Sequence, residues 1–288
     1  MKHKHCRSDG AGLYKFVVRI GHRELHKAVQ SRRSDNLCNE TLNLITKDCI
    51  MFRTEDLDDH EWMITRTCSG SVLSPKWTLT AGHCLPTTLN DKTGAIVQYA
   101  DFGDFDMSRS VVVVKHAVYH PNTKIIDFND FLQLFNDIGL LQHEPVKLKT
   151  FGKISAVLTS SVFGQKAVLA GLGNMPNGQE TKELLLLDVL SKKCDDEKLN
   201  IRVVPSICVA RLCGTESGIC EGDSGGPLIH ASGIIGVSSL GLVNCELKKS
   251  GYSGTTTAVA PFLKWMRDVM KDVKVPLPTT EVSADKPE

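Results

Sequence analysis

The sequence predicts an all-β protein, folded as a sandwich or a barrel. Short strand-like stretches separated by turn signals recur along the chain, and residues 111–118 form a β-branched run. Helical periodicity is almost absent. The exception is residues 261–270, where apolar residues recur at helical spacing after a proline suited to the start of a helix. Many short strands with one late helix favour the all-β class.

The composition describes an ordinary globular protein with balanced charge. The chain has 288 residues, 41% hydrophobic and 23% charged, which allows one large domain or two moderate ones. Its formal net charge of +1 argues against nucleic acid or an anionic membrane as an obligatory partner. No run approaches the ~18 apolar residues that a membrane-spanning helix needs, so we expect a soluble protein.

Ten cysteines in one chain indicate an oxidising compartment. No C-x-x-C pair is present, and the nearest close pair, Cys208 and Cys213, lacks a matching pair of histidines. We therefore expect neither a metal nor another cofactor. A disulfide framework is the better interpretation, and it implies secretion. The basic N-terminus is followed by no apolar signal core, so secretion is expected with no signal peptide visible in this chain.

A serine enclosed by glycines stands in residues 220–227, C-E-G-D-S-G-G-P. A serine hydroxyl is a poor nucleophile, so it needs a base within hydrogen-bond reach and donors for the resulting oxyanion. Glycines on both sides let the backbone turn sharply and direct successive N–H groups at one point. A G-x-S-x-G match alone is weak evidence, because it also marks an unrelated hydrolase fold.

The complete string resembles the nucleophile loop of the trypsin/chymotrypsin-like serine proteases, and two other segments agree with it. Residues 79–84, L-T-A-G-H-C, resemble the family's T-A-A-H-C, and residues 136–141, N-D-I-G-L-L, resemble its N-D-I-A-L-L. The order His83, Asp137, Ser224 is that of chymotrypsin and differs from that of subtilisin and the α/β-hydrolases. A lipase or esterase is therefore a poor interpretation.

The resemblance implies two six-stranded antiparallel barrels, with the active site in the cleft between them and a C-terminal helix. It covers residues 50–273, expected to form the protease domain. Residues 1–49 are polar, charged and short of strand alternation, and we expect a leader or pro-region there. Residues 61–64 resemble the family's first barrel strand. Residues 274–288, with three prolines and several charges, are expected to form a disordered tail.

The resemblance also implies a role for each site residue. Ser224 would attack the scissile carbonyl, with His83 as general base and then general acid, and Asp137 would hold the imidazole in the right tautomer. The backbone N–H groups of Gly222 and Ser224 would form the oxyanion hole. Ser239 matches the serine that contacts the catalytic aspartate. A structural role as a strand serine is nearly as well supported.

Substrate preference depends on the positions that match the family's primary pocket. Gly218 stands at the base, where trypsin-like members have an aspartate, and Ile219 lies beside it. Gly241 and Gly254 match wall positions, where small residues leave the pocket open. Such a pocket favours large or medium apolar residues over cationic ones. The implied substrate-binding residues are Gly218, Ile219, Ser239, Gly241 and Gly254.

The cysteines divide into three pairs that the resemblance assigns and four that it does not. The assigned disulfides are Cys68–Cys84, Cys194–Cys208 and Cys220–Cys245. Cys6, Cys38, Cys49 and Cys213 remain unassigned. Cys38 could pair with Cys49, or either could pair with Cys213.

Activation is the least family-like part of the sequence. In the family a newly cut N-terminal Ile or Val inserts its ammonium beside the aspartate before the nucleophile, here Asp223, and a buried carboxylate needs such a partner. The matching start is near Ile50, which follows Cys49 instead of a basic residue. Three accounts stay open: unusual processing at Ile50, an internal cation that replaces the amine, or an unformed oxyanion hole. We expect a low-activity precursor, a zymogen, that gains activity when the chain starts at Ile50.

The leading functional prediction is a secreted serine endopeptidase that acts on a peptide or protein substrate, with a protein inhibitor as a further candidate partner. The alternative is a catalytically weak homologue that serves as a binding or regulatory module. Gly82 stands where the family usually has alanine, and Leu240 where it has tryptophan, which is the drift that such homologues show. We expect Gly82 to loosen the packing behind His83 at a cost of ~0.5–1 kcal/mol, without removing a catalytic group.

Overall fold

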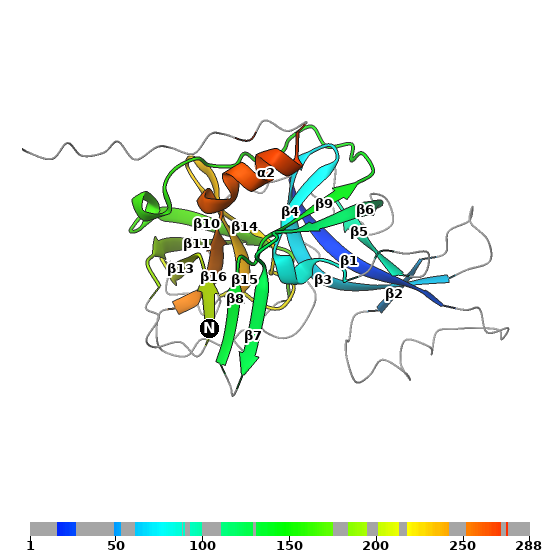
Figure 1. The fold of residues 1–288 in the computed structure, drawn as a ribbon, viewed down its shortest axis with the longest axis horizontal. Coiled ribbons are helices and arrows are strands. Elements are labelled where there is room, and N and C mark those ends of the chain that lie inside the picture. The colour runs from blue at the N-terminus through cyan, green and yellow to red at the C-terminus, as the bar shows by residue number, and fades with distance from the viewer. Residues whose placement is uncertain are drawn as a thin grey trace, which may run out of the picture.

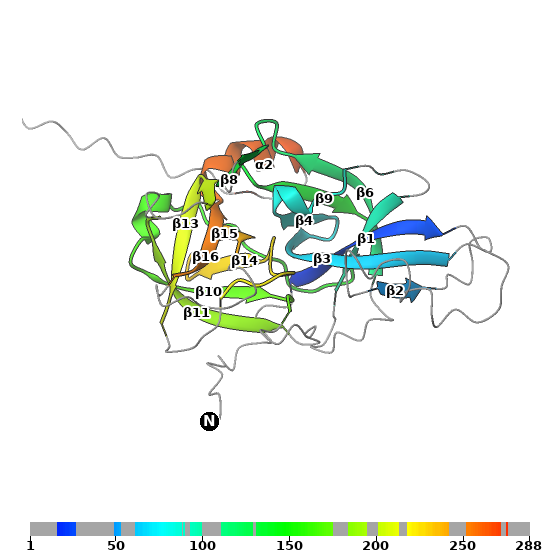
Figure 2. The same cartoon turned by 90° about the horizontal axis from the view of Figure 1, so that it is seen from below.

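The computed structural model describes residues 16–26, 49–52, 61–87, 89, 93–99, 111–128, 131–174, 184–194, 201–212, 218–241, 252–271 and 275. Two β-barrels lie side by side (Figures 1 and 2). None of the helices within these ranges is both long and apolar enough to cross a membrane.

The first barrel contains six antiparallel strands, and pairing between the first two of them in sequence closes it. In spatial order these are β1 (Val17–His26), β5 (Thr93–Gln98), β6 (Val111–Tyr119), β9 (Gly139–His143), β4 (Trp77–Thr80) and β3 (Glu61–Ser74). A further strand, β2 (Cys49–Phe52), pairs with the outer part of β3. The β-branched run in β6 alternates as a half-buried strand should, because Val112 and Val114 are buried while their neighbours are partly exposed.

The position of β1 corrects the expected start of the folded domain. Residues 17–26 were expected in a leader, but they pair with β3 from Val17↔Ser71 to His26↔Glu61 and with β5 on the other side. The alternation was hidden because residues 16–21 are all buried, so that a charged residue, Arg19, stands in the interior. Residues 61–64 are consequently the beginning of β3, and the first barrel strand is β1. A leader remains an expectation for residues before 16, which lie outside the described residues.

The place of β1 in the barrel also argues against activation by a cut before Ile50. A chain that starts at Ile50 would lack β1, and with it two strand pairings and the core residues Val17, Val18 and Ile20. Ile50 itself lies inside β2, opposite Ile64 of β3. The structure therefore argues against the expected gain of activity on starting the chain at Ile50, because that cut would open the first barrel.

The second barrel closes with six antiparallel strands around its own core, and the prediction of two six-stranded barrels is confirmed. In spatial order these are β10 (Lys166–Gly171), β11 (Leu185–Lys192), β13 (Ser206–Arg211), β16 (Tyr252–Ala258), β15 (Gly233–Leu240) and β14 (Pro227–His230).

A small third sheet, absent from the predictions, joins the two barrels. The hairpin β7 (Lys124–Phe128) and β8 (Phe131–Phe135) is inserted between β6 and Asp137, and β8 pairs in parallel with β12 (Ile201–Val204) from the second half of the chain. The hairpin projects from the body of the protein (Figure 1). At its base the Asn136 N–H donates to the Val204 carbonyl at 2.7 Å, so the segment before Asp137 is tied to both barrels.

The predicted C-terminal helix is confirmed as α2 (Leu263–Val269), preceded by a 3-10 turn over Ala260–Phe262. It follows the second barrel, yet its buried residues belong to the core cluster that contains most of the buried residues of the first barrel. His120 packs edge-on against the rings of Phe262 and Trp265, with centroids 4.9 and 5.2 Å away. Of the expected disordered tail only Val275 is described, and its side chain is buried.

Candidate active site

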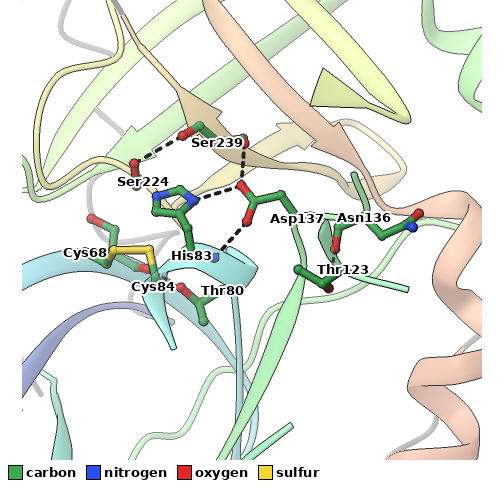
Figure 3. A network of polar contacts seen from close by, with 10 residues as sticks. Cys68, Thr80, His83, Cys84, Thr123, Asn136, Asp137, Ser224 and Ser239 are labelled. Carbon is green, nitrogen blue, oxygen red and sulfur yellow. Dashed lines mark hydrogen bonds and ion pairs between the residues drawn. A yellow bond between two sulfur atoms is a disulfide. The ribbon is translucent and has the colours of Figure 1, made fainter. Parts of the chain in front are cut away.

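Three segments that are distant in sequence bring the predicted site residues together between the barrels (Figure 3). His83 stands on the 3-10 turn Gly82–Cys84 that follows β4, and Asp137 stands between β8 and β9. Ser224 comes from the turn that precedes β14 in the second barrel. The first two residues therefore belong to one barrel and the third to the other, as the resemblance implied.

Asp137 is buried and holds His83 at two points. Its Oδ1 accepts from the His83 backbone N–H at 2.8 Å, and its Oδ2 lies 2.8 Å from Nδ1 of the ring. The Ser239 hydroxyl also donates to Oδ2. Burial raises the pKa of Asp137, but the hydrogen bonds and charge of His83 and the bond from Ser239 outweigh it, so the pKa lies below its ordinary value. The ionised carboxylate can only accept, so Nδ1 carries the proton and Nε2 is left as a base.

Ser224 lies on the side of the imidazole opposite Asp137 (Figure 3). Its hydroxyl donates to the carbonyl of Ser239 at 3.3 Å, and no hydrogen bond joins it to His83 in this structure. Catalytic hydrogen bonds are often long or misaligned in a protein without substrate. Ser239 contacts both Asp137, through its hydroxyl, and Ser224, through its carbonyl. The contact of its hydroxyl with Asp137 is the one that the resemblance implied.

The backbone at Gly222 leaves two N–H groups for an anion. Gly222 has φ +86°, a left-handed conformation, and a Cβ there would lie 2.9 Å from the Gly173 Cα. The Glu221 carbonyl accepts from the Asn174 N–H at 2.8 Å, and because a trans peptide directs C=O and N–H oppositely, the Gly222 N–H faces away from Asn174. Within the described ranges neither this N–H nor that of Ser224 has a hydrogen-bond partner. Both N–H groups are therefore available to an acceptor in this structure.

Asp223, a partly buried residue, lies between these two residues. Its Oδ1 accepts from the Gly173 N–H and its Oδ2 from the Cys220 N–H, both at 2.9 Å. Burial raises the pKa of Asp223 to about 6, although the two backbone hydrogen bonds lower it. The described part of the chain supplies no ion-pair partner for this carboxylate.

The positions expected to form the primary pocket meet around Ile219. Gly218 is half-buried and Ile219 is buried. A Cβ at Gly254 would lie 2.5 Å from the Ile219 Cδ1, and a Cβ at Gly241 would collide with the Ile219 carbonyl. The two wall glycines thus make room for Ile219, so part of the space expected to be open is taken by its side chain.

Two of the three assigned disulfides are confirmed, and the third lies partly outside the described residues. Cys68–Cys84 ties β3 to the turn that carries His83, and Cys194–Cys208 lies in the second barrel. Cys220 is also disulfide-bonded, while its expected partner Cys245 is outside the described ranges. The sulfurs of Cys68 and Cys84 lie within 4.8 Å of a His83 nitrogen, but disulfide sulfurs are not thiolate ligands, so this cluster is not a metal site.

Gly82 is more tightly packed than we expected from its sequence. A Cβ there would lie 3.1 Å from Asp137 Oδ1 and 3.2 Å from the Ile138 N–H nitrogen, closer than ordinary contact. The expectation that the missing methyl loosens the packing behind His83 is therefore wrong, because the Asp137–Ile138 backbone already approaches this glycine.

Ser69 is the main site residue that the sequence analysis missed. Residues 68–71, C-S-G-S, align with C-G-G-S of the family. The serine at position 69, where the family has glycine, was the signal that could have identified this residue. Its Oγ donates to the Gly222 carbonyl at 2.8 Å and accepts from the Leu172 N–H at 3.0 Å.

Comparisons with known proteins agree with this geometry. The family model described as Trypsin matches residues 54–266. Trypsin I-P1 of Gallus gallus is 29% identical over 210 residues, which are 70% of this chain and 79% of that protein. Trypsin 5G1 of Aedes aegypti is 31% identical over 212 residues, 70% of this chain and 74% of that protein.

A solved structure supports the fold independently. Neuropsin, a serine protease expressed in the limbic system of mouse brain, superposes with a TM-score of 0.59 at 20% identity, covering 77% of this chain and 93% of its own. The two barrels, the matched family model and the trypsin relatives place this chain in the trypsin-like serine protease family.

Proposed function

We propose that this protein is a secreted serine endopeptidase that hydrolyses peptide bonds through an acyl-enzyme formed on Ser224, with a preference for apolar residues before the scissile bond. The observation that supports it most is the arrangement of His83 on an ionised Asp137, with the hydroxyl of Ser224 beside the ring and two unpaired N–H groups at Gly222 and Ser224. Peptides and proteins are the substrates that membership of the family implies.

The residues support a two-step acyl transfer. Ser224 Oγ attacks the peptide carbonyl while His83 Nε2 takes its proton, and the carbonyl oxygen becomes an oxyanion that the N–H groups of Gly222 and Ser224 stabilise. As the C–N bond breaks, His83 returns the proton to the leaving amine. Water then attacks the ester with His83 again as base, and Ser224 is regenerated. Asp137 stabilises the imidazolium at each stage.

The apolar preference rests on the absence of charge at the predicted pocket base. Gly218 offers no carboxylate, and Ile219 adds an apolar side chain between Gly241 and Gly254. A substrate Lys or Arg would lose its hydration there without gaining a partner, which is costly for a buried charge. The disulfides Cys68–Cys84 and Cys194–Cys208 favour an oxidising compartment and hence secretion. A protein inhibitor that occupies the same cleft is the second partner class that we propose.

One observation favours the alternative of a catalytically weak homologue with a binding role. The Ser224 hydroxyl donates to Ser239 and not to His83, and a serine that stays in this bond would not be activated. A weak homologue would bind peptides or proteins in the same cleft without turnover.

Labelling with a fluorophosphonate separates the two functions without a known substrate, because the reagent phosphonylates only an activated serine. The intact chain should be labelled at Ser224, while the Ser224→Ala and His83→Ala variants should not be labelled. Folding of each variant is checked by circular dichroism. Absence of labelling in a folded parent protein would favour the binding module.

A further inference from the structure

One peptide group links a buried cation to the buried carboxylate behind the nucleophile. Arg19 of β1 is 4% exposed, and its Nη2 donates to the Leu172 carbonyl at 3.1 Å. The N–H of the same peptide belongs to Gly173 and donates to Asp223 Oδ1 at 2.9 Å. Because C=O and N–H of a trans peptide point in opposite directions, Arg19 and Asp223 hold the Leu172–Gly173 peptide from its two ends.

This arrangement places opposite charges at the two ends of a polarised group. A cation on the carbonyl strengthens the N–H of that peptide as a donor, since linked hydrogen bonds polarise one another in a buried environment. The bond to the Asp223 carboxylate is therefore stronger with Arg19 present than without it. Asp223 in turn lies between Gly222 and Ser224, whose N–H groups form the proposed oxyanion hole.

Ser69 of β3 contacts the same two segments from a second direction. Its hydroxyl is fully buried, accepts from the Leu172 N–H at 3.0 Å and donates to the Gly222 carbonyl at 2.8 Å. Its backbone N–H donates to the Ser224 carbonyl at 2.8 Å. Leu172 is thus held at its N–H by Ser69 and at its carbonyl by Arg19. Both residues come from the first barrel, while Leu172, Gly222 and Ser224 belong to the second half of the chain.

We propose that Arg19 and Ser69 form an internal lock that holds residues 220–224 in the oxyanion-binding form without a newly cut ammonium beside Asp223. In this proposal the contacts of Arg19 and Ser69 with Leu172 do the work expected of a newly cut N-terminus. It makes Arg19 and Ser69 positioning residues, which act on the substrate only through the Gly222 and Ser224 N–H groups. The inference rests on the proposed peptidase function, and its test is designed to fail separately from it.

The test compares four single variants with the parent chain, each expressed behind an uncleaved N-terminal fusion and verified by intact mass. Ser69→Ala removes one arm of the lock and Arg19→Met the other. Arg19→Lys keeps a cation that can donate to Leu172. Ser71→Ala is the matched control, because Ser71 is a buried serine two positions along β3 whose hydroxyl has no hydrogen-bond partner. Measurements are kcat and KM on a peptide substrate and the melting temperature.

The lock predicts that Ser69→Ala and Arg19→Met each lower kcat by about tenfold, less than the roughly 10²–10³-fold loss on removing an oxyanion donor outright. KM should change little, because the oxyanion exists only in the transition state. Arg19→Lys should keep more activity than Arg19→Met. Replacing a buried charge by an apolar side chain is often neutral or stabilising, so the melting temperature of Arg19→Met should not fall with kcat. Ser71→Ala should match the parent.

Several outcomes would overturn the lock while leaving the peptidase function intact. These are an active parent whose Ser69→Ala and Arg19→Met variants keep its kcat, a fall in kcat that Ser71→Ala shares, or a parent that gains activity only after a new N-terminus is cut. A parent that hydrolyses no peptide and reacts with no fluorophosphonate, both behind its fusion and after such a cut, would overturn the proposed function and the lock with it. If Arg19→Met does not fold, the kcat of Ser69→Ala relative to the parent tests the lock on its own.

Discussion

Replacing Asp223 by asparagine should change how the stability of the protein depends on pH. Asp223 is a partly buried residue whose carboxylate accepts hydrogen bonds from the Gly173 and Cys220 N–H groups and has no ion-pair partner in the described part of the chain. Burial raises the pKa of this group from 3.8 to about 6. The Asp223→Asn variant keeps the shape of the side chain and removes its titration.

The sign and size of the effect follow from that pKa. Below pH 3.8 both the folded and the unfolded chain hold the Asp223 proton, so its full contribution to stability is present. As the pH rises, the unfolded chain releases the proton first, and stability is lost until the folded protein releases it near pH 6. The gap between the two pKa values corresponds to about 3 kcal/mol, at 1.36 kcal/mol per pKa unit.

Urea unfolding of the intact, disulfide-bonded chain at pH 3 to 7 measures this contribution. The unfolding free energy of the parent, relative to that of Asp223→Asn, should fall by about 3 kcal/mol across this range. Other carboxylates, including Asp137 with its lowered pKa, titrate in both proteins and cancel in the comparison. Parallel curves would refute the raised pKa. A difference of the opposite sign would show that a cation pairs with Asp223, as an inserted ammonium would.

Three further outcomes are expected. Asp137→Asn should lower kcat by about 10⁴, because the imidazole loses the acceptor that sets its tautomer; a variant with parental kcat and an unchanged pH profile would contradict the role of the His83–Asp137 bond. Profiling on a peptide library should show cleavage after Leu, Met or Phe with Lys and Arg poor, and Gly218→Asp should shift the preference toward Lys and Arg; a basic preference in the parent would place the pocket base elsewhere. Mass spectrometry of unreduced digests should show Cys220 joined to Cys245, whereas another partner for Cys220 would refute the predicted pairing.

The sequence was sufficient for the features that short local motifs encode. The segments around His83, Asp137 and Ser224 each match several residues of a family motif, and the fold places the three side chains near one another (Figure 3). The C-terminal helix was visible because its apolar residues repeat at helical spacing over a full two turns. Cys68 could be paired with Cys84 because both flank recognisable motifs.

The features that were missed depend on contacts between distant segments. β1 was hidden because Arg19 is buried in a strand whose neighbours are buried too, so apolar and polar residues do not alternate. The Leu172 carbonyl, which accepts a hydrogen bond from the Arg19 guanidinium, is 153 residues away in sequence. The parallel pairing of β8 with β12 joins an insertion in one barrel to a connection in the other, and no local pattern specifies that register. The hairpin β7–β8 could have been predicted from its two apolar runs flanking N-D at residues 129–130.

An acyl group trapped on the enzyme during turnover would identify the nucleophile. The intact chain is mixed with an activated ester of an apolar N-blocked amino acid, quenched in acid during turnover and digested, and the acylated residue is located by mass spectrometry. We expect one acyl group per molecule on Ser224, absent from the Ser224→Ala and His83→Ala variants. An acyl group on another residue, or hydrolysis by Ser224→Ala at the parental rate, would contradict it.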